Sequence, residues 1–198
     1  MNRNAERGRA TRDQLVDVAT ALFAANGYEE TSIEAVLREA GVSRGSLYHH
    51  FPSKDALFYA VLEQVEERIF VEMMETTRDV SDPVELLRAG ALSWIRLAAN
   101  PVVRRIVLIE APSVLGWHRW RQFDEDHALG TIKGAMHAAA EAGALDPAHA
   151  DAFAHILMAA VNEMALVLSR ADDQAAAVSA AEGAVDEFLT RLLGQPPG

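Results

Sequence analysis

The sequence predicts an all-α protein in which a three-helix N-terminal domain, residues 1–53, precedes a larger helical domain, residues 54–198. Three observations predict it. Nearly every segment repeats its apolar residues at the helical period, and no run alternates β-branched and aromatic residues as a strand would. In addition, two short helical segments are joined by a tight glycine turn at Gly41, which is the pattern of a helix-turn-helix.

The first two helices are set by apolar spacing and by glycine. One apolar face of the first helix recurs at helical spacing and consists of Leu15, Val18, Ala19, Leu22 and Phe23. Gly27 ends this helix because it can adopt a positive φ. Thr31 and Glu34 have the spacing of a capping box that opens a second helix, and Gly41 ends that helix.

The next two helices are set by caps and a proline. Ser43 is expected to cap a third helix, which ends near Phe51 because Pro52 disfavours helical backbone in the residue before it. A fourth helix begins at Ser53 and continues to about Thr77.

Proline and glycine also divide the rest of the chain. Further helices are predicted over residues 81–100, 117–142, 147–170 and 172–193. Pro101, Pro112 and Gly116 divide the middle of the chain, and no helix is assigned between residues 100 and 117.

Composition excludes several classes of protein. The chain of 198 residues has no cysteine, so disulfide scaffolds, thiol nucleophiles and cysteine-based metal sites are excluded. Uninterrupted apolar runs fall short of the roughly 18 residues that a membrane span needs. The N-terminal residues carry several arginines and no hydrophobic segment, unlike a secretory signal. A soluble, cytoplasmic protein without a membrane partner is therefore expected.

The acidity of the chain is unevenly distributed. Residues 1–54 hold seven Lys or Arg and seven Asp or Glu, so the formal charge of −11 falls entirely on residues 55–198. A strongly negative surface repels a polyanion. If nucleic acid is a partner, the N-terminal quarter of the chain must contact it.

The segment 40–51 carries the most specific signal. Leu47 and Phe51 lie one helical turn apart and are expected to bury the inner face of the third helix. The residues left on or near its outer face are Arg44, Gly45, Ser46, Tyr48, His49 and His50. Most of these side chains can form hydrogen bonds or stack, which suits a major groove. Gly45 is costly inside a helix, and close approach of the backbone to DNA would explain it.

These residues resemble the TetR family of transcriptional regulators. The matching positions are Phe23, Gly27, Thr31, Ile33, Ala40-Gly41-Val42-Ser43, Leu47-Tyr48, Phe51, Ser53-Lys54-Asp55 and Leu57. The resemblance covers about residues 10–62 at motif level and continues only as an all-helical pattern. Leu37 departs from it, because the family usually has a small alanine there, which implies local repacking.

The resemblance implies that the N-terminal domain binds double-stranded operator DNA. It implies phosphate contacts by Thr31, Tyr48 and Lys54, and contacts to bases or backbone by Arg44, Gly45, Ser46 and His49. Helix N-termini favour anions, which agrees with the positions of Thr31 and Ser53. Arg7, Arg9 and Arg12 could reach a flanking phosphate or the minor groove. The alternative is that Tyr48 is a core aromatic and Lys54 a solvated charge.

The last two predicted helices have broad apolar stripes. In proteins that this chain resembles, they pair with their copies in a four-helix homodimer interface, and helix-turn-helix proteins commonly bind as two-fold dimers. The predicted interface residues are Phe153, Leu157, Val161, Met164, Leu168, Val185, Phe188, Leu189 and Leu192. The alternative is that these stripes form intramolecular core.

The middle of the chain is rich in large aromatic residues. Aromatic and methionine side chains with a few polar groups are typical of an apolar ligand cavity. The predicted ligand-binding residues are Trp94, Trp117, His118, Trp120, Phe123, His127, Met158 and Asn162, with Asp124, His155 and Glu163 as further polar candidates. A well-packed core with surface histidines is the alternative. A metal site at His118, Asp124 and His127 lacks further specified ligands, so an exposed polar face is favoured.

The favoured hypothesis is a non-enzymatic repressor that a small apolar or amphipathic effector releases from its operator. Residues 1–53 would bind DNA, and residues 54–198 would bind the effector and dimerise. No cofactor or metal is expected, and no motif of a hydrolase, phosphate loop or metalloprotease is present. A transcriptional activator of the same fold, or a helical interaction scaffold without a ligand, remains the alternative.

Overall fold

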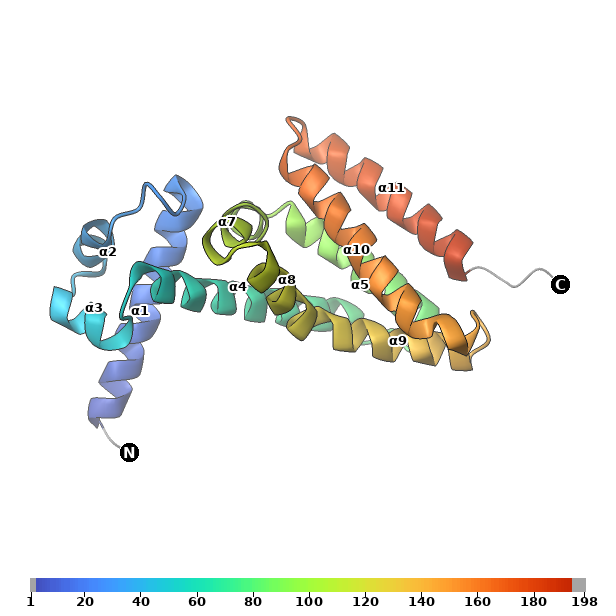
Figure 1. Cartoon of the computed structure of the whole chain (residues 1–198), viewed down its shortest axis with the longest axis horizontal. Coiled ribbons are helices and arrows are strands. Elements are labelled where there is room, and N and C mark those ends of the chain that lie inside the picture. Colours follow the sequence, from blue (N-terminus) through green and yellow to red (C-terminus); the bar gives the residue numbers. More distant parts are fainter. Residues whose placement is uncertain (1–2, 194–198) are drawn as a thin grey trace. The chain divides into compact units, whose positions relative to one another are not determined.

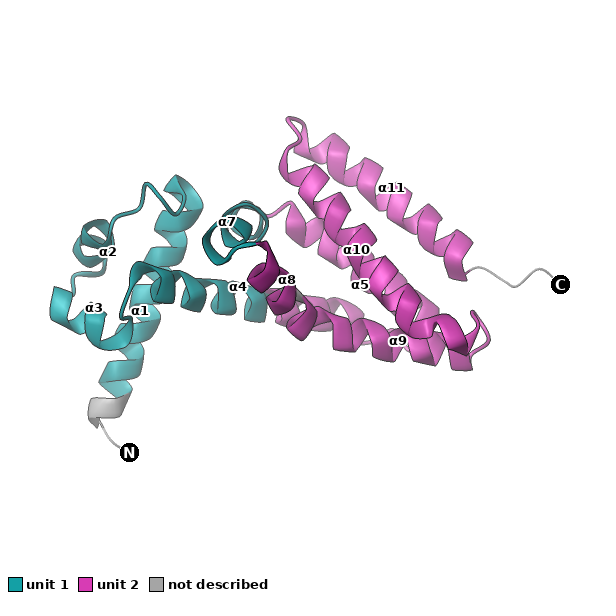
Figure 2. Ribbon diagram, viewed as in Figure 1, with its two compact units in different colours: residues 1–68, 101–116 teal, residues 69–100, 117–198 magenta. Residues whose placement is uncertain are grey.

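A computed structural model describes residues 3–193, and this range is helical with no strand, as predicted (Figure 1). The helices fall into two compact units. The first comprises the residues up to 68 together with 101–116, and the second comprises 69–100 and 117 onward (Figure 2). Residues 101–116 therefore belong to the first unit, although the residues before and after them belong to the second. Sequence analysis did not predict this division.

The first unit begins with three helices, α1 (Arg3–Asn26), α2 (Ile33–Ala40) and α3 (Arg44–His50), and includes the N-terminal part of α4 (Lys54–Thr77). The predicted glycine stops are confirmed, since Gly27 and Gly41 have φ of 89° and 65°. The predicted caps of α3 and α4 are also present. The Ser43 and Ser53 hydroxyls accept hydrogen bonds from backbone N–H groups three residues later, at 3.2 and 3.1 Å.

An aromatic cluster holds this unit together. Phe23, at the end of α1, and Phe58, on α4, are fully buried, and their ring centroids lie 5.5 Å apart. Tyr28 packs edge-on against Phe58 with the ring centroids 5.2 Å apart. At the other end, the Gln14 side chain donates a hydrogen bond to the Ala40 carbonyl at 2.9 Å. These contacts fix α1 against α2 and α4, so the short α2 and α3 need not be stable alone.

The predicted capping box at the start of α2 is wrong by one residue. The N-cap is Ser32, whose hydroxyl accepts from the Ala35 N–H at 3.1 Å. Thr31 is buried, and its hydroxyl donates instead to the Gly27 carbonyl at 2.8 Å. The reason is tertiary, because Thr31 closes the turn back onto the end of α1, and this leaves the next serine at the capping position.

The segment to which no helix was assigned is helical throughout. It contains α6 (Pro101–Val103), the π-helical turn η1 (Arg104–Glu110) and α7 (Ala111–Leu115). Pro101 lies at the start of α6, where the missing N–H costs nothing, and Pro112 lies at the junction of η1 and α7. The segment packs against α1. The Arg105 Nε to Glu110 Oε1 ion pair, at 2.8 Å, lies beside Gly27.

The second unit is a bundle of helices. Its principal members are α5 (Pro83–Ala98), α9 (Gly130–Glu141), α10 (Ala150–Ser169) and α11 (Gln174–Leu193). The segment α8 (Trp117–Asp124) and the π-helical turn η2 (Glu125–Leu129) lead into α9, and the 3₁₀ turn η3 (Pro147–His149) leads into α10. One apolar core joins the principal helices, with Ile95, Met136 and Leu189 among its fully buried members.

One helix of this bundle meets the length and hydropathy of a membrane span, although its uninterrupted apolar runs are short. The segment Pro147–Ser169 is long and apolar enough, by length and composition, to cross a membrane. Sequence analysis missed it because polar residues interrupt the apolar run. Buried residues of α10, such as Leu157 and Leu168, pack in the core with α5, α9 and α11. The core helix of a bundle passes the same test of length and composition.

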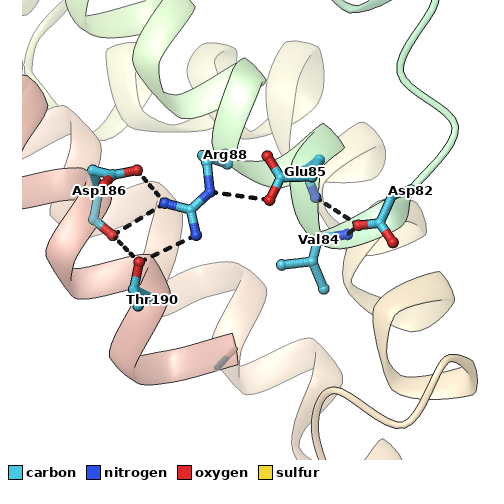
Figure 3. Close-up of polar contacts among 6 residues, drawn as sticks. All are labelled: Asp82, Val84, Glu85, Arg88, Asp186 and Thr190. Atoms are coloured by element: carbon cyan, nitrogen blue, oxygen red, sulfur yellow. Dashed lines mark hydrogen bonds and ion pairs between the residues drawn. The ribbon is translucent and has the colours of Figure 1, made fainter. Parts of the chain in front are cut away.

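A polar network ties α5 to α11 (Figure 3). Arg88 pairs with Asp186 and donates a hydrogen bond to the Thr190 hydroxyl at 3.2 Å. On its own helix, Arg88 Nε lies 3.4 Å from Glu85 Oε1. The Asp82 side chain caps α5 by accepting from two backbone N–H groups. Arg88 thus links two helices that are about 100 residues apart in sequence.

Arg88→Met is expected to lower the free energy of unfolding of the second unit by about 1 kcal/mol, because it removes these contacts but keeps an apolar stem. The Asp186 side chain is half exposed, so solvent screening holds the value near this level. All three tryptophans lie in this unit, so urea denaturation followed by tryptophan fluorescence measures the free energy of unfolding of the second unit. Arg191→Met, which removes an exposed pair with Glu187 on the same helix, is the control. Equal losses in the two variants would contradict a tertiary role for Arg88.

Candidate nucleic-acid interface

The outer face of α3 is open to solvent, as predicted. Leu47 and Phe51 are buried against the unit, whereas the Tyr48 side chain is 44% exposed. Arg44, Gly45 and His49 are exposed, and Ser46 is half-buried. A Cβ built on Gly45 would meet no atom within 4 Å, so packing inside the chain gives no reason for glycine there. The structure therefore presents the predicted groove-contacting residues on one accessible helix.

The first residue of α3 is paired across the turn. The Arg44 guanidinium forms an ion pair with the Glu34 carboxylate in the first turn of α2. It also lies over the Tyr48 ring, with Cζ 6.0 Å from the ring centroid. Glu34 was predicted only as a capping residue, so its contact with Arg44 is a finding of the structure.

Lys54 is held by contacts that sequence analysis did not predict. Its Nζ lies 4.1 Å from the centroid of the Tyr28 ring and donates a hydrogen bond to the Glu29 carbonyl at 3.4 Å. The Tyr28 hydroxyl in turn donates to Asp55. Burial, together with the Asp55 carboxylate, raises the pKa of Tyr28 above its usual value, so the hydroxyl stays protonated and donates. Neither of the predicted alternatives for Lys54 included this aromatic contact.

The helix N-termini that could bind an anion differ in part from those predicted. The N-terminus of α4 begins at Lys54, directly after the exposed cap Ser53, so a cation and helix-terminal N–H groups lie together. The buried Thr31 hydroxyl is engaged with backbone carbonyls, so its predicted phosphate contact stays a prediction. Ser32, which is exposed at the start of α2, is an additional candidate.

The N-terminal arginines lie on a helix rather than an extended arm. Because α1 begins at Arg3, both Arg7 and Arg9 are helical, and both are exposed. Arg12 lies over Phe51, with Cζ 5.4 Å from the ring centroid. Arg12 is thus engaged with the end of α3, while Arg7 and Arg9 stay candidates for contacts to flanking DNA.

The predicted dimerisation residues divide into two groups. Leu157, Val161, Leu168, Val185 and Leu189 are buried in the core of a single chain, so they have no surface to offer a second copy. For these five the intramolecular alternative is correct. The partly buried members are Phe153, Met164, Phe188 and Leu192.

Two apolar residues of α10 were missed. Ile156 and Val167 are 49% and 52% exposed, although only Ile156 belongs to the apolar stripe that the sequence predicts for this helix. Helical periodicity finds apolar faces but does not say which face the chain itself covers. An outward apolar face on α10 is therefore present, with a narrower set of residues than predicted.

The predicted ligand-binding residues also divide. Trp120, Phe123, Met158 and Asn162 are buried, and Trp94 is half-buried against the core. Within the part of the chain that the structure describes, the Trp94 indole N–H is buried without a hydrogen-bond partner. Trp117 is 62% exposed, although its ring lies against that of Trp120, with the centroids 4.9 Å apart.

The two histidines of the predicted ligand set lie on the surface. His118 and His127 are exposed. The His127 ring stacks on Phe123, and its Nδ1 lies 2.7 Å from the Phe123 carbonyl oxygen. His155 and Glu163 are exposed as well. Among the described side chains, which do not include that of Asp124, no cluster of three or more could hold a metal ion.

The fold and the solvent-exposed outer face of α3 define a helix-turn-helix protein with an appended helical bundle. Residues 15–61 match the model for bacterial regulatory proteins of the tetR family, and residues 84–192 match a tetracyclin repressor-like C-terminal domain. The chain belongs to the TetR family of bacterial transcriptional regulators and carries that family's DNA-binding helix-turn-helix domain. The family consists of regulators rather than enzymes.

Individual relatives agree with this membership. The transcriptional regulator UidR of Escherichia coli is 37% identical over 65 residues, which is 33% of each chain. The transcriptional repressor Rv1474c of Mycobacterium tuberculosis is 40% identical over 60 residues, or 30% of this chain and 32% of its own. The matches thus span about a third of these relatives. A TetR-family regulator structure from Pectobacterium atrosepticum is similar over 100% of both chains, with a TM-score of 0.82 and 26% identity.

Proposed function

We propose that this chain is a dimeric transcriptional repressor that binds operator DNA through α3 and is released by a small apolar or amphipathic effector. The observation that carries the DNA-binding part is the exposed outer face of α3 beside a preorganised lysine at the start of α4. Arg44, Ser46 and His49 would face bases, while Tyr48 and Lys54 would contact phosphates. Residues 1–53 and the adjoining Lys54 supply these contacts.

Charge supports the same orientation. Residues 1–54 have no formal net charge, whereas residues 55–198 carry all of the −11, so a phosphate backbone is repelled by the second part and not by the first. The contact with Tyr28 already restricts the Lys54 side chain. Less side-chain conformational entropy is therefore lost when Lys54 binds a phosphate.

Dimerisation through residues 54–198 would place two copies of α3 on successive turns of one DNA face. The exposed Ile156 and Val167, with the partly buried Phe153, Met164, Phe188 and Leu192, supply an apolar surface for a second copy. A two-fold dimer reads half-sites about 34–36 Å apart, or multiples of this distance.

Effector release would act through a difference in affinity between two conformations of the chain. The buried Trp94 indole N–H supports an effector that carries a hydrogen-bond acceptor, since buried donors are normally paired. The chain passes between the two units after residues 68, 100 and 116, so a change in the second unit has three covalent routes to the first. A cytoplasmic location follows from the proposed operator. Repression is preferred over activation because the relative Rv1474c is named a repressor.

Lys54→Ala is expected to weaken binding to all DNA sequences alike and to reduce the slope of log affinity against log salt by about 0.9, because one phosphate contact is lost. The measurement is titration of labelled duplexes from the DNA upstream of the gene, and of scrambled duplexes, at two salt concentrations. Lys133→Ala is a matched control, since Lys133 lies on α9 and pairs with Asp151 at 3.6 Å. An unchanged slope in Lys54→Ala would contradict the proposed contact, and no salt-dependent binding by the unaltered protein would contradict DNA binding.

A further inference from the structure

We infer that Glu34 sets the DNA sequence specificity of this protein by positioning Arg44. The inference rests on the proposed function, since it takes α3 as the helix that reads the groove. Its starting point is the ion pair between Arg44, the first residue of α3, and Glu34, in the first turn of α2. Arg44 also lies against Tyr48, so the guanidinium is oriented from two sides.

The Arg44–Glu34 ion pair contributes little to the stability of the folded unit. The side chains of Arg44 and Glu34 are 61% and 62% exposed, and ion pairs this exposed contribute little to folding. A cation in the first turn of a helix also opposes the helix dipole, so Arg44 is poorly placed for stabilising α3. The pair can therefore be changed without unfolding the unit, so its effect on binding can be measured separately from stability.

A carboxylate beside α3 has a defined effect near DNA. Phosphates repel Glu34 unless its charge is compensated, and Arg44 compensates it only while the two stay paired. If Arg44 turned toward a phosphate, Glu34 would be left unpaired against a polyanion. Sequence-independent phosphate contact by Arg44 is thus disfavoured, which penalises DNA without the correct base.

The same pair leaves Arg44 able to read a base. A guanidinium has five N–H donors in a rigid fork, and the contact with Glu34 is made through Nη2. The remaining donors can engage the O6 and N7 acceptors of a guanine while Glu34 stays paired. A correctly placed guanine is then accepted, and other contacts of Arg44 are discouraged.

The test is Glu34→Gln, which keeps the shape of the side chain and removes its charge. Duplexes are first selected by the unaltered protein from a random-sequence pool, and binding to a selected duplex and to a scrambled one is then measured at several salt concentrations. We expect the variant to bind the scrambled duplex about fivefold more tightly and the selected duplex almost unchanged. The slope of log affinity against log salt on scrambled DNA should steepen by about 0.9, since Arg44 gains a phosphate contact.

Two controls separate this role from simple loss of charge. Glu39→Gln removes the same charge from an exposed position on the same helix and should leave the ratio of the two affinities unchanged. In an Arg44→Ala background, Glu34→Gln should no longer alter that ratio. An unchanged thermal midpoint shows that the variants are folded.

The outcomes are distinguishable. An unaltered ratio in Glu34→Gln, an equal gain on both duplexes, or the same change in the Arg44→Ala background would overturn the role of Glu34 while leaving DNA binding by α3 intact. If the unaltered protein selects no sequence from the pool, the proposed function itself fails, and this inference fails with it.

Discussion

Phe23→Ala is expected to lower the free energy of unfolding of the first unit by about 3–5 kcal/mol, the usual cost of emptying a fully buried phenylalanine site. The Phe23 ring has no solvent exposure and contacts the rings of both Tyr28 and Phe58. Those two rings belong to the elements that hold Lys54 and the start of α4. Loss of Phe23 therefore removes the support of the DNA-binding surface along with stability.

Urea denaturation followed by far-UV circular dichroism measures this loss. The matched control is Phe70→Ala, because Phe70 is 51% exposed on α4, and its removal should change stability by less than about 0.5 kcal/mol. A similar loss in both variants would show that Phe23 is not the centre of the core described above.

Gly27→Ala is expected to destabilise the first unit by about 2–4 kcal/mol, because a residue with a Cβ is strained at positive φ and also meets a crowded site. A Cβ at Gly27 would lie 2.7 Å from Glu110 Oε1 and would also collide with the Arg105 guanidinium. Since Glu110 is mostly buried, the ion pair cannot move aside without losing part of its contact with Arg105.

Gly41→Ala provides the comparison. Gly41 also has a positive φ, yet a Cβ there would meet no atom within 4 Å, so only backbone strain of roughly 1–2 kcal/mol is expected. Chemical denaturation of both variants gives the difference directly. Equal losses would contradict the close packing of the segment 101–116 on the end of α1.

Features that depend on a few neighbouring residues were predictable. Gly27 and Gly41 end helices because of their own backbone freedom, and Ser43 caps α3 through an N–H three residues away. Leu47 and Phe51 are buried because they share one helix face. The boundaries of the N-terminal helices and the exposed face of α3 follow from such local rules.

Features that depend on tertiary contacts were not predictable from the pattern. Thr31 and Ser32 are both capping residues by type, and the way the chain folds back on the end of α1, where the Leu22 and Gly27 carbonyls accept from Thr31, leaves Ser32 to cap α2. The contact of Lys54 with Tyr28 and that of Arg44 with Glu34 join residues 26 and 10 positions apart, beyond the reach of helical periodicity.

The second unit shows the same limit. Leu189 and Ile156 are both apolar residues on apolar helices, yet the first is buried in the chain and the second is half exposed. Which side of a helix another helix covers depends on the whole bundle. The predicted interface set therefore includes five residues that are buried within the chain and omits the half-exposed Ile156, while the interface itself stays a prediction.

The most direct test of the account is selection of duplexes from a random-sequence pool by the unaltered protein, followed by sequencing. Two copies of α3 held on a two-fold dimer should enrich an inverted repeat whose half-sites are separated by about one helical turn or a multiple of it. Enrichment of a single unrepeated site, or of no sequence at all, would contradict a dimeric helix-turn-helix reader.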